Sequence, residues 1–132
     1  MAMMRPLHLL LIEDDPDSAD AMSLLLRTRG IDVDWVGSGE DALEFFRRGR
    51  AQTVDVILLD IMLPDTDGAS LVAQLSQIAP LPPIVIHSAS SEARVAKTGA
   101  LVHAMAVLRK PTDWGKLLTL LEGCRRAERA AG

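Results

Sequence analysis

Five short apolar runs alternate with amphipathic stretches, and this alternation most constrains what the chain can fold into. Most of the runs lack polar residues at every second position, as expected for strands that are covered on both faces. The predicted strands are Leu7–Ile12, Ile31–Val36, Val54–Leu59, Pro83–His87 and Ala104–Leu108. The predicted helices are about Asp17–Arg29, Gly39–Arg48, Gly68–Ile78, Ser91–Leu101 and Asp113–Ala127. Such an order predicts an α/β domain with a parallel sheet and helices on both of its faces.

The composition bears on whether the chain binds nucleic acid and on the cellular compartment in which it works. The 132 residues suit one domain, and a net charge of −4 argues against direct nucleic-acid binding, which needs a basic face. The single cysteine, Cys124, forms no internal disulfide and fits a cytoplasmic setting. No apolar run approaches the roughly 18 residues that cross a membrane. The run Leu9–Ile12 leads directly into acidic residues, so we interpret it as a buried strand and not as part of a signal peptide.

Glycines and short polar residues mark several helix ends. Gly30 and Gly49 follow the first two helical patterns and are expected to end them. Ser38 and Thr112 are placed to cap the starts of two other helices. Either Asp14 or Asp15 could cap the first helix.

Polar residues follow four of the five predicted strands. They are Glu13, Asp14 and Asp15 after the first strand, Asp60 after the third, Ser88 after the fourth, and Arg109 and Lys110 after the fifth. Each alone fits a helix cap, a turn or a solvated surface position. Together they lie at the carboxyl edge of a parallel sheet, where ligands bind in such folds. Carboxylates gathered there repel one another unless a cation or proton compensates, and Mg²⁺ prefers oxygen ligands, so this edge is a predicted metal site.

The order and spacing of five motifs carry a resemblance to a known family. The motifs are Leu11–Pro16, Ser38–Leu43, Leu58–Gly68, Ser88-Ala89 and Lys110-Pro111. Over about residues 6–125 the chain resembles the receiver domain of bacterial two-component response regulators. This resemblance implies a flavodoxin-like, doubly wound (βα)5 fold with strand order 2-1-3-4-5. It also implies that residues 1–132 form a single receiver domain with no effector domain.

The resemblance implies a role for each residue that matches the motifs. Asp60 would be the phosphoacceptor, while Ser88 and Lys110 would contact phosphoryl oxygens. The metal, Mg²⁺ or Mn²⁺, would be held by Asp14 directly, by Glu13 through water, by Asp60, and by the backbone carbonyl of Met62. The bond between Lys110 and Pro111 would be cis, which orients the lysine.

The implied function is phosphorelay signalling in the cytoplasm. A sensor histidine kinase or a histidine phosphotransfer protein would donate the phosphoryl group to Asp60, and the domain would then switch a downstream protein or effector domain. Such a domain catalyses only its own phosphorylation and dephosphorylation. Two alternatives are a pseudo-receiver, which is an interaction module that is never phosphorylated, and an aspartyl-phosphate phosphohydrolase of the haloacid dehalogenase type. The hydrolase needs a second acidic residue at the position of Met62, and the pseudo-receiver usually lacks residues that are present here.

The chain departs from the family pattern near the fifth strand. Relatives usually carry an aromatic residue three positions before the lysine, and Val107 stands there. Relatives also tend to end the fourth helix with glycine at the position of His103, whereas Gly99 lies four residues earlier. We therefore expect a weaker fourth helix and a switch without the usual ring movement. His87 is interpreted as filling a strand-end position.

Overall fold

The described chain alternates strands and helices as the apolar runs predict. A computed structural model describes residues 5–89 and 104–124. Its strands are β1 (His8–Ile12), β2 (Asp32–Val36), β3 (Val56–Leu59), β4 (Ile84–Ser88) and β5 (Ala104–Arg109). Its helices are α1 (Pro16–Arg27), α2 (Gly39–Arg47), α3 (Gly68–Ile78) and α5 (Trp114–Glu122), with a short 3-10 turn at Arg50–Thr53. The helix predicted at about 91–101, with Gly99 and His103, lies outside the described residues.

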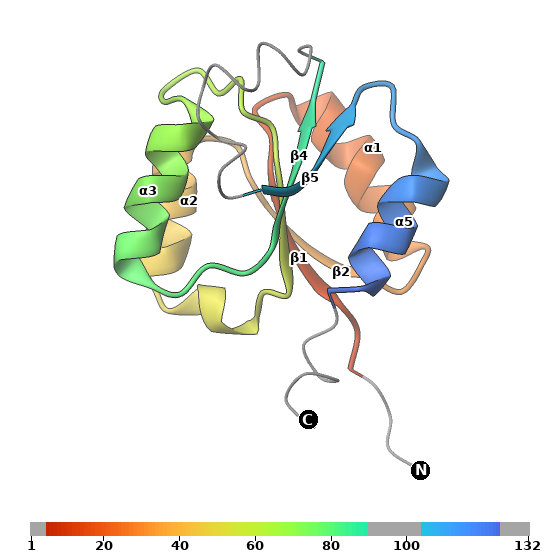
Figure 1. The fold of residues 1–132 in the computed structure, drawn as a ribbon, viewed down its shortest axis with the longest axis horizontal. Helices are drawn as coiled ribbons and strands as arrows, with labels where there is room; N and C mark the ends of the chain where they lie inside the picture. The colour runs from red at the N-terminus through yellow and green to blue at the C-terminus, as the bar shows by residue number, and fades with distance from the viewer. Residues whose placement is uncertain (1–4, 90–103, 125–132) are drawn as a thin grey trace.

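The five strands form one parallel sheet in the order β2-β1-β3-β4-β5, which confirms the predicted topology. Helices α2 and α3 cover one face of the sheet, and α1 and α5 cover the other (Figure 1). Side chains from alternate strand positions build a core on each face. Leu10, Ile57 and Ile86 pack towards α2 and α3, whereas Leu9, Leu58 and Val85 pack towards α1 and α5.

Short polar side chains start the helices. Asp15 caps α1 by accepting hydrogen bonds from the N–H groups of Asp17 and Ser18, so Asp15 and not Asp14 takes this role. Ser38 caps α2, as predicted. The prediction that Thr112 caps α5 is wrong, because Asp113 accepts the hydrogen bond from the Lys116 N–H. Capping by Asp15 leaves the Asp14 carboxylate available for another partner.

Two glycines end their segments with a left-handed backbone. Gly30 and Gly49 have φ values of 76° and 77°, a conformation in which a Cβ atom would be strained. Both predicted stops are therefore confirmed. Within the described residues, no helix has the length and apolar character needed to cross a membrane.

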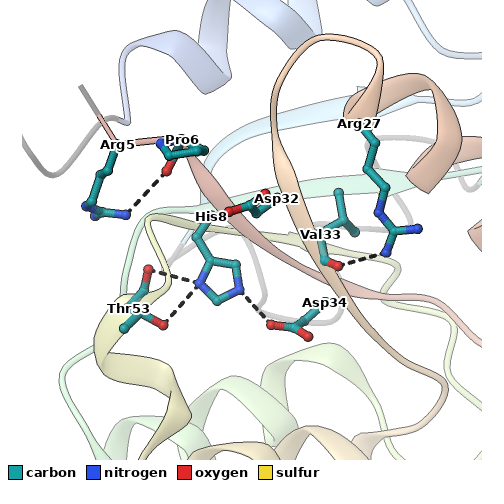
Figure 2. A pocket seen from close by; sticks show the side chains of 8 residues that line it. All are labelled: Arg5, Pro6, His8, Arg27, Asp32, Val33, Asp34 and Thr53. Carbon is teal, nitrogen blue, oxygen red and sulfur yellow. Dashed lines mark hydrogen bonds and ion pairs between the residues drawn. The ribbon is translucent and has the colours of Figure 1, made fainter. Parts of the chain in front are cut away.

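The amino edge of the sheet holds a hollow of about 430 Å³, and several of the side chains that line it form hydrogen bonds with neighbouring residues (Figure 2). His8 lies at its centre and bonds through Nε2 to the Asp34 carboxylate (2.7 Å). Its Nδ1 lies 3.1 Å from the Thr53 carbonyl. Arg27 donates to the Val33 carbonyl (3.0 Å), and Arg50 pairs with Asp34. These contacts tie β1, β2 and the 3-10 turn together, and the predicted functional residues all lie at the opposite edge.

Candidate functional site

The carboxyl edge of the sheet brings the predicted site residues together. Parallel pairing matches Ile12 with Leu59, so the residues that follow β1 and β3 emerge side by side. Backbone bonds continue the pairing past the strand ends, because the Asp60 N–H donates to the Ile12 carbonyl at 3.0 Å. The Lys110 N–H donates to the Ser88 carbonyl, also at 3.0 Å. Four strands thus deliver polar groups to one site.

Three carboxylates form the centre of this site. Glu13, Asp14 and Asp60 each offer an oxygen atom, and these atoms all lie within 4.8 Å of one another. Glu13 is buried, Asp60 is half-buried and Asp14 is exposed, so the cluster opens to solvent on the Asp14 side. The donor set is all oxygen, and such a set, with one side open to water, fits Mg²⁺ or Mn²⁺.

The loop after Asp60 is held against the cluster by hydrogen bonds. The Met62 N–H donates to Asp60 Oδ1 at 2.9 Å, although the Met62 side chain points largely into solvent. Further along the loop, the Asp65 carboxylate accepts hydrogen bonds from the N–H groups of Gly39 and Glu40, each at 3.0 Å. These bonds lower the pKa of Asp65, with the Gly39 bond having the largest effect. The segment that contains the Met62 carbonyl is therefore anchored both to Asp60 and to α2.

Lys110 contacts two of the three carboxylates of the acidic cluster. Its Nζ atom lies 2.7 Å from Glu13 Oε1 and 3.3 Å from Asp60 Oδ2, and the peptide bond to Pro111 is cis, as expected. Burial lowers the pKa of Lys110, but the bond to Glu13 and the charge of Asp60 outweigh this and raise it above the ordinary value. Burial also raises the pKa of Glu13, and the Lys110 partner offsets only part of that effect. The raised pKa of Lys110 therefore reflects its two carboxylate partners, whereas the raised pKa of Glu13 reflects mainly its burial.

Ser88 ends β4 and is fully buried beside the site. The pairing register places it opposite Arg109, one residue before the lysine. The structure therefore places all six predicted residues, Glu13, Asp14, Asp60, Met62, Ser88 and Lys110, at or next to one edge of the sheet.

Comparison with known proteins decides the family. The model of the response regulator receiver domain matches residues 9–122. The chain belongs to this family. DltR, a transcriptional regulatory protein of Streptococcus agalactiae, is 32% identical over 112 residues, which are 85% of this chain and 49% of DltR. This receiver domain spans about half or less of the length of the curated relatives that it matches.

Solved receiver domains share the fold. A CheY-like receiver domain from Methylobacillus flagellatus is 29% identical with a TM-score of 0.76, covering 90% of this chain and 98% of its own. The receiver domain of sensor histidine kinase PA1611 from Pseudomonas aeruginosa is 25% identical with a TM-score of 0.74, covering 90% and 97%. That structure has a magnesium ion coordinated in its active-site cleft.

Val107 lies on the face of the sheet that α2 and α3 cover. It pairs with Ile86 across the β4–β5 ladder and packs, half-buried, against the core on that side. A valine therefore occupies the position at which the resemblance leads us to expect an aromatic ring.

Two contacts of the receiver domain were not predicted from the sequence. His87 is buried, as interpreted, and its Nε2 atom also shares a hydrogen bond of 2.7 Å with the Thr112 hydroxyl, which accounts for the failed cap prediction. The indole N–H of Trp35 donates to the Glu13 carbonyl at 2.7 Å. Both contacts join residues far apart in the chain. The residues next to them in the sequence do not indicate which partner each side chain will bond.

His87 is expected to make the stability of the domain depend on pH. Burial, reinforced by the positive charge of Lys110 and partly opposed by Asp60, lowers the pKa of His87 from 6.5 to about 4. The folded protein therefore holds His87 neutral while the unfolded chain takes up a proton below pH 6.5. The contribution of His87 to the free energy of unfolding is fully present above pH 6.5 and is lost as the pH falls towards 4. At pH 5 the loss is about 2 kcal/mol.

Urea unfolding at pH 7 and pH 5 measures this effect. The free energy of unfolding of the wild type is expected to fall further than that of His87→Leu, by about 2 kcal/mol. Other groups titrate in both proteins, so their contribution cancels in the comparison. Equal pH dependence in the two proteins would show that His87 is not held neutral by the fold.

Proposed function

We propose that this receiver domain accepts a phosphoryl group from a phosphohistidine donor onto Asp60, with Mg²⁺ or Mn²⁺ bound at the acidic cluster. The observation that carries the proposal is the meeting of Glu13, Asp14 and Asp60 with Lys110, which contacts both Glu13 and Asp60. A positive charge anywhere near the cluster would balance its negative charges. Lys110 instead contacts Asp60, the proposed acceptor, where its ammonium group can also contact an incoming phosphoryl group.

The transfer forms one bond and breaks another. A carboxylate oxygen of Asp60 bonds to phosphorus while the bond from phosphorus to the donor imidazole nitrogen breaks. The imidazole leaves with the electron pair of that bond. A carboxylate and a phosphoryl group repel each other, and negative charge lies on the phosphoryl oxygens in a loose transition state. A cation bound by Glu13, Asp14 and Asp60 would neutralise part of that charge.

Lys110 and Ser88 would neutralise the remaining charge on the phosphoryl oxygens. The ammonium group already lies 3.3 Å from Asp60 Oδ2, so it needs little movement to pair with an oxygen of a group attached there. Ser88 offers a hydroxyl from the end of β4, on the neighbouring strand. New phosphoryl oxygens would attract this hydroxyl, and its movement would transmit phosphorylation to the surface of the domain.

The domain would act as a switch and not as an enzyme for outside substrates. It would catalyse its own phosphorylation and dephosphorylation, in the cytoplasm, and would pass the signal to a downstream protein or an attached effector domain. A sensor histidine kinase or a histidine phosphotransfer protein would supply the phosphoryl group. The exposed Met62 side chain offers no acid–base group beside Asp60, which disfavours a phosphohydrolase.

Small phosphodonors test this proposal without a known kinase. Acetyl phosphate or phosphoramidate is expected to add one phosphoryl group to the protein in the presence of Mg²⁺ and none in the presence of excess chelator. Intact-mass spectrometry measures the addition, and circular dichroism confirms that the fold survives the chelator. A folded protein that gains no mass with either donor and Mg²⁺ would instead be a pseudo-receiver.

A further inference from the structure

An exposed aromatic residue lies beside the acidic cluster. Trp35 belongs to the edge strand β2 and is 42% exposed, which by itself suggests an ordinary solvent-facing side chain. Its indole N–H, however, donates to the Glu13 carbonyl at 2.7 Å. The indole ring also passes close to Gly37, where an added Cβ atom would lie 3.5 Å from Trp35 Cζ2 and 4.0 Å from the Glu13 carbonyl oxygen. The ring therefore lies along the Glu13 peptide.

Strand β2 holds both backbone groups of Glu13. The Glu13 N–H donates to the Val36 carbonyl at 3.1 Å, which continues the β1–β2 ladder by one residue. Beyond this point the ladder ends, and the side chain of Trp35 supplies the next hydrogen bond in place of the backbone. The indole thus fixes the peptide that joins Glu13 to Asp14.

Asp14 depends on this peptide for its position. Its carboxylate is exposed and, among the residues that the structure describes, makes no hydrogen bond or ion pair. On its other side the chain is held by Asp15, whose carboxylate caps α1. The direction of the Asp14 Cα–Cβ bond is therefore set by a backbone held between the α1 cap and the Trp35 hydrogen bond.

We propose that Trp35 is a positioning residue of the metal site, and that its indole N–H orients the Glu13 carbonyl and so places the Asp14 carboxylate for Mg²⁺ or Mn²⁺. The inference rests on the proposed function, because it assumes that the acidic cluster binds the ion. Metal sites lose affinity when groups that orient their ligands are removed. The hydrogen bond exists with and without the ion, so only the part of its free energy that positions Asp14 enters the affinity, and the expected change is at most about tenfold.

The test measures Mn²⁺ affinity from the free-ion signal in electron paramagnetic resonance, with Mg²⁺ as competitor. Trp35→Phe is expected to bind Mn²⁺ about threefold to tenfold more weakly than the wild type. Trp114→Phe is the matched control, since it changes the other tryptophan of the chain and is expected to retain wild-type affinity. Affinity of Trp35→Phe equal to that of the wild type would overturn the proposal.

A second replacement isolates the N–H group from the ring. Benzothienylalanine at position 35 keeps the two-ring shape but places sulfur where tryptophan has its N–H. It is expected to weaken Mn²⁺ binding as Trp35→Phe does, while circular dichroism measured with chelator shows a retained fold. Wild-type affinity in this variant would show that the ring and not the hydrogen bond matters, and would overturn the assignment.

The same titration separates this inference from the proposed function. Binding of Mn²⁺ to the wild type that is lost in Asp14→Ala supports the metal site itself. If the wild type binds no Mn²⁺, the proposed function fails and so does the inference. If Asp14→Ala loses binding while both Trp35 variants keep it, only the inference about Trp35 fails.

Discussion

Asp60→Asn is expected to remain unphosphorylated under conditions in which acetyl phosphate and Mg²⁺ label the wild type. An amide is isosteric with the carboxylate, but it is a much weaker nucleophile and carries no charge. Lys110 would keep its 2.7 Å contact with Glu13, so the site is expected to keep its shape. The effect should therefore appear as lost chemistry with retained folding, and intact-mass spectrometry measures it directly.

Asp41→Asn provides the control for Asp60→Asn. Asp41 is an exposed acidic residue in the first turn of α2. Its replacement by asparagine removes one negative charge, as Asp60→Asn does. This variant is expected to gain one phosphoryl group as the wild type does. Equal labelling of Asp60→Asn and wild type would mean that another residue is the acceptor, and peptide mapping would then identify it.

The fold was predictable because its signals are local. A run such as Val56–Leu59 is buried at every position, which needs helices on both faces of its sheet. Gly30 and Gly49 marked segment ends because a left-handed backbone favours glycine. The meeting of Asp60 with Glu13 and Asp14 then followed from parallel pairing, which brings all carboxyl ends of strands to one edge.

The contacts missed from the sequence are those whose partner is chosen in three dimensions. Thr112 and Asp113 are both suitable caps and are neighbours in the chain, so their sequence does not distinguish them. In the structure Thr112 bonds to His87, 25 residues away, which leaves the cap to Asp113. Trp35 bonds to a backbone carbonyl, and any residue at position 13 would present one.

The second large effect concerns Asp14 and Lys110, whose replacements are expected to separate metal binding from phosphorylation. Asp14→Ala removes an oxygen of the acidic cluster and is expected to weaken Mg²⁺ binding at least tenfold, the lower end of losses seen for groups that only support metal ligands. Lys110→Ala removes a positive charge that lies among the same oxygens, at 2.7 Å from Glu13 and 3.3 Å from Asp60. Its metal affinity is expected to be retained or increased, because less repulsion opposes the ion.

Phosphorylation is expected to respond differently in these two variants. Lys110→Ala should slow labelling by acetyl phosphate about a hundredfold even at saturating Mg²⁺, because one donor to the phosphoryl oxygens is lost. Asp14→Ala should recover part of its rate as the Mg²⁺ concentration is raised. Lys116→Ala, which removes an exposed lysine of α5, is the control and should match the wild type in both measurements. If Lys110→Ala lost metal affinity as severely as Asp14→Ala, the lysine would belong to the metal site itself, and its separate role at the phosphoryl group would have to be abandoned.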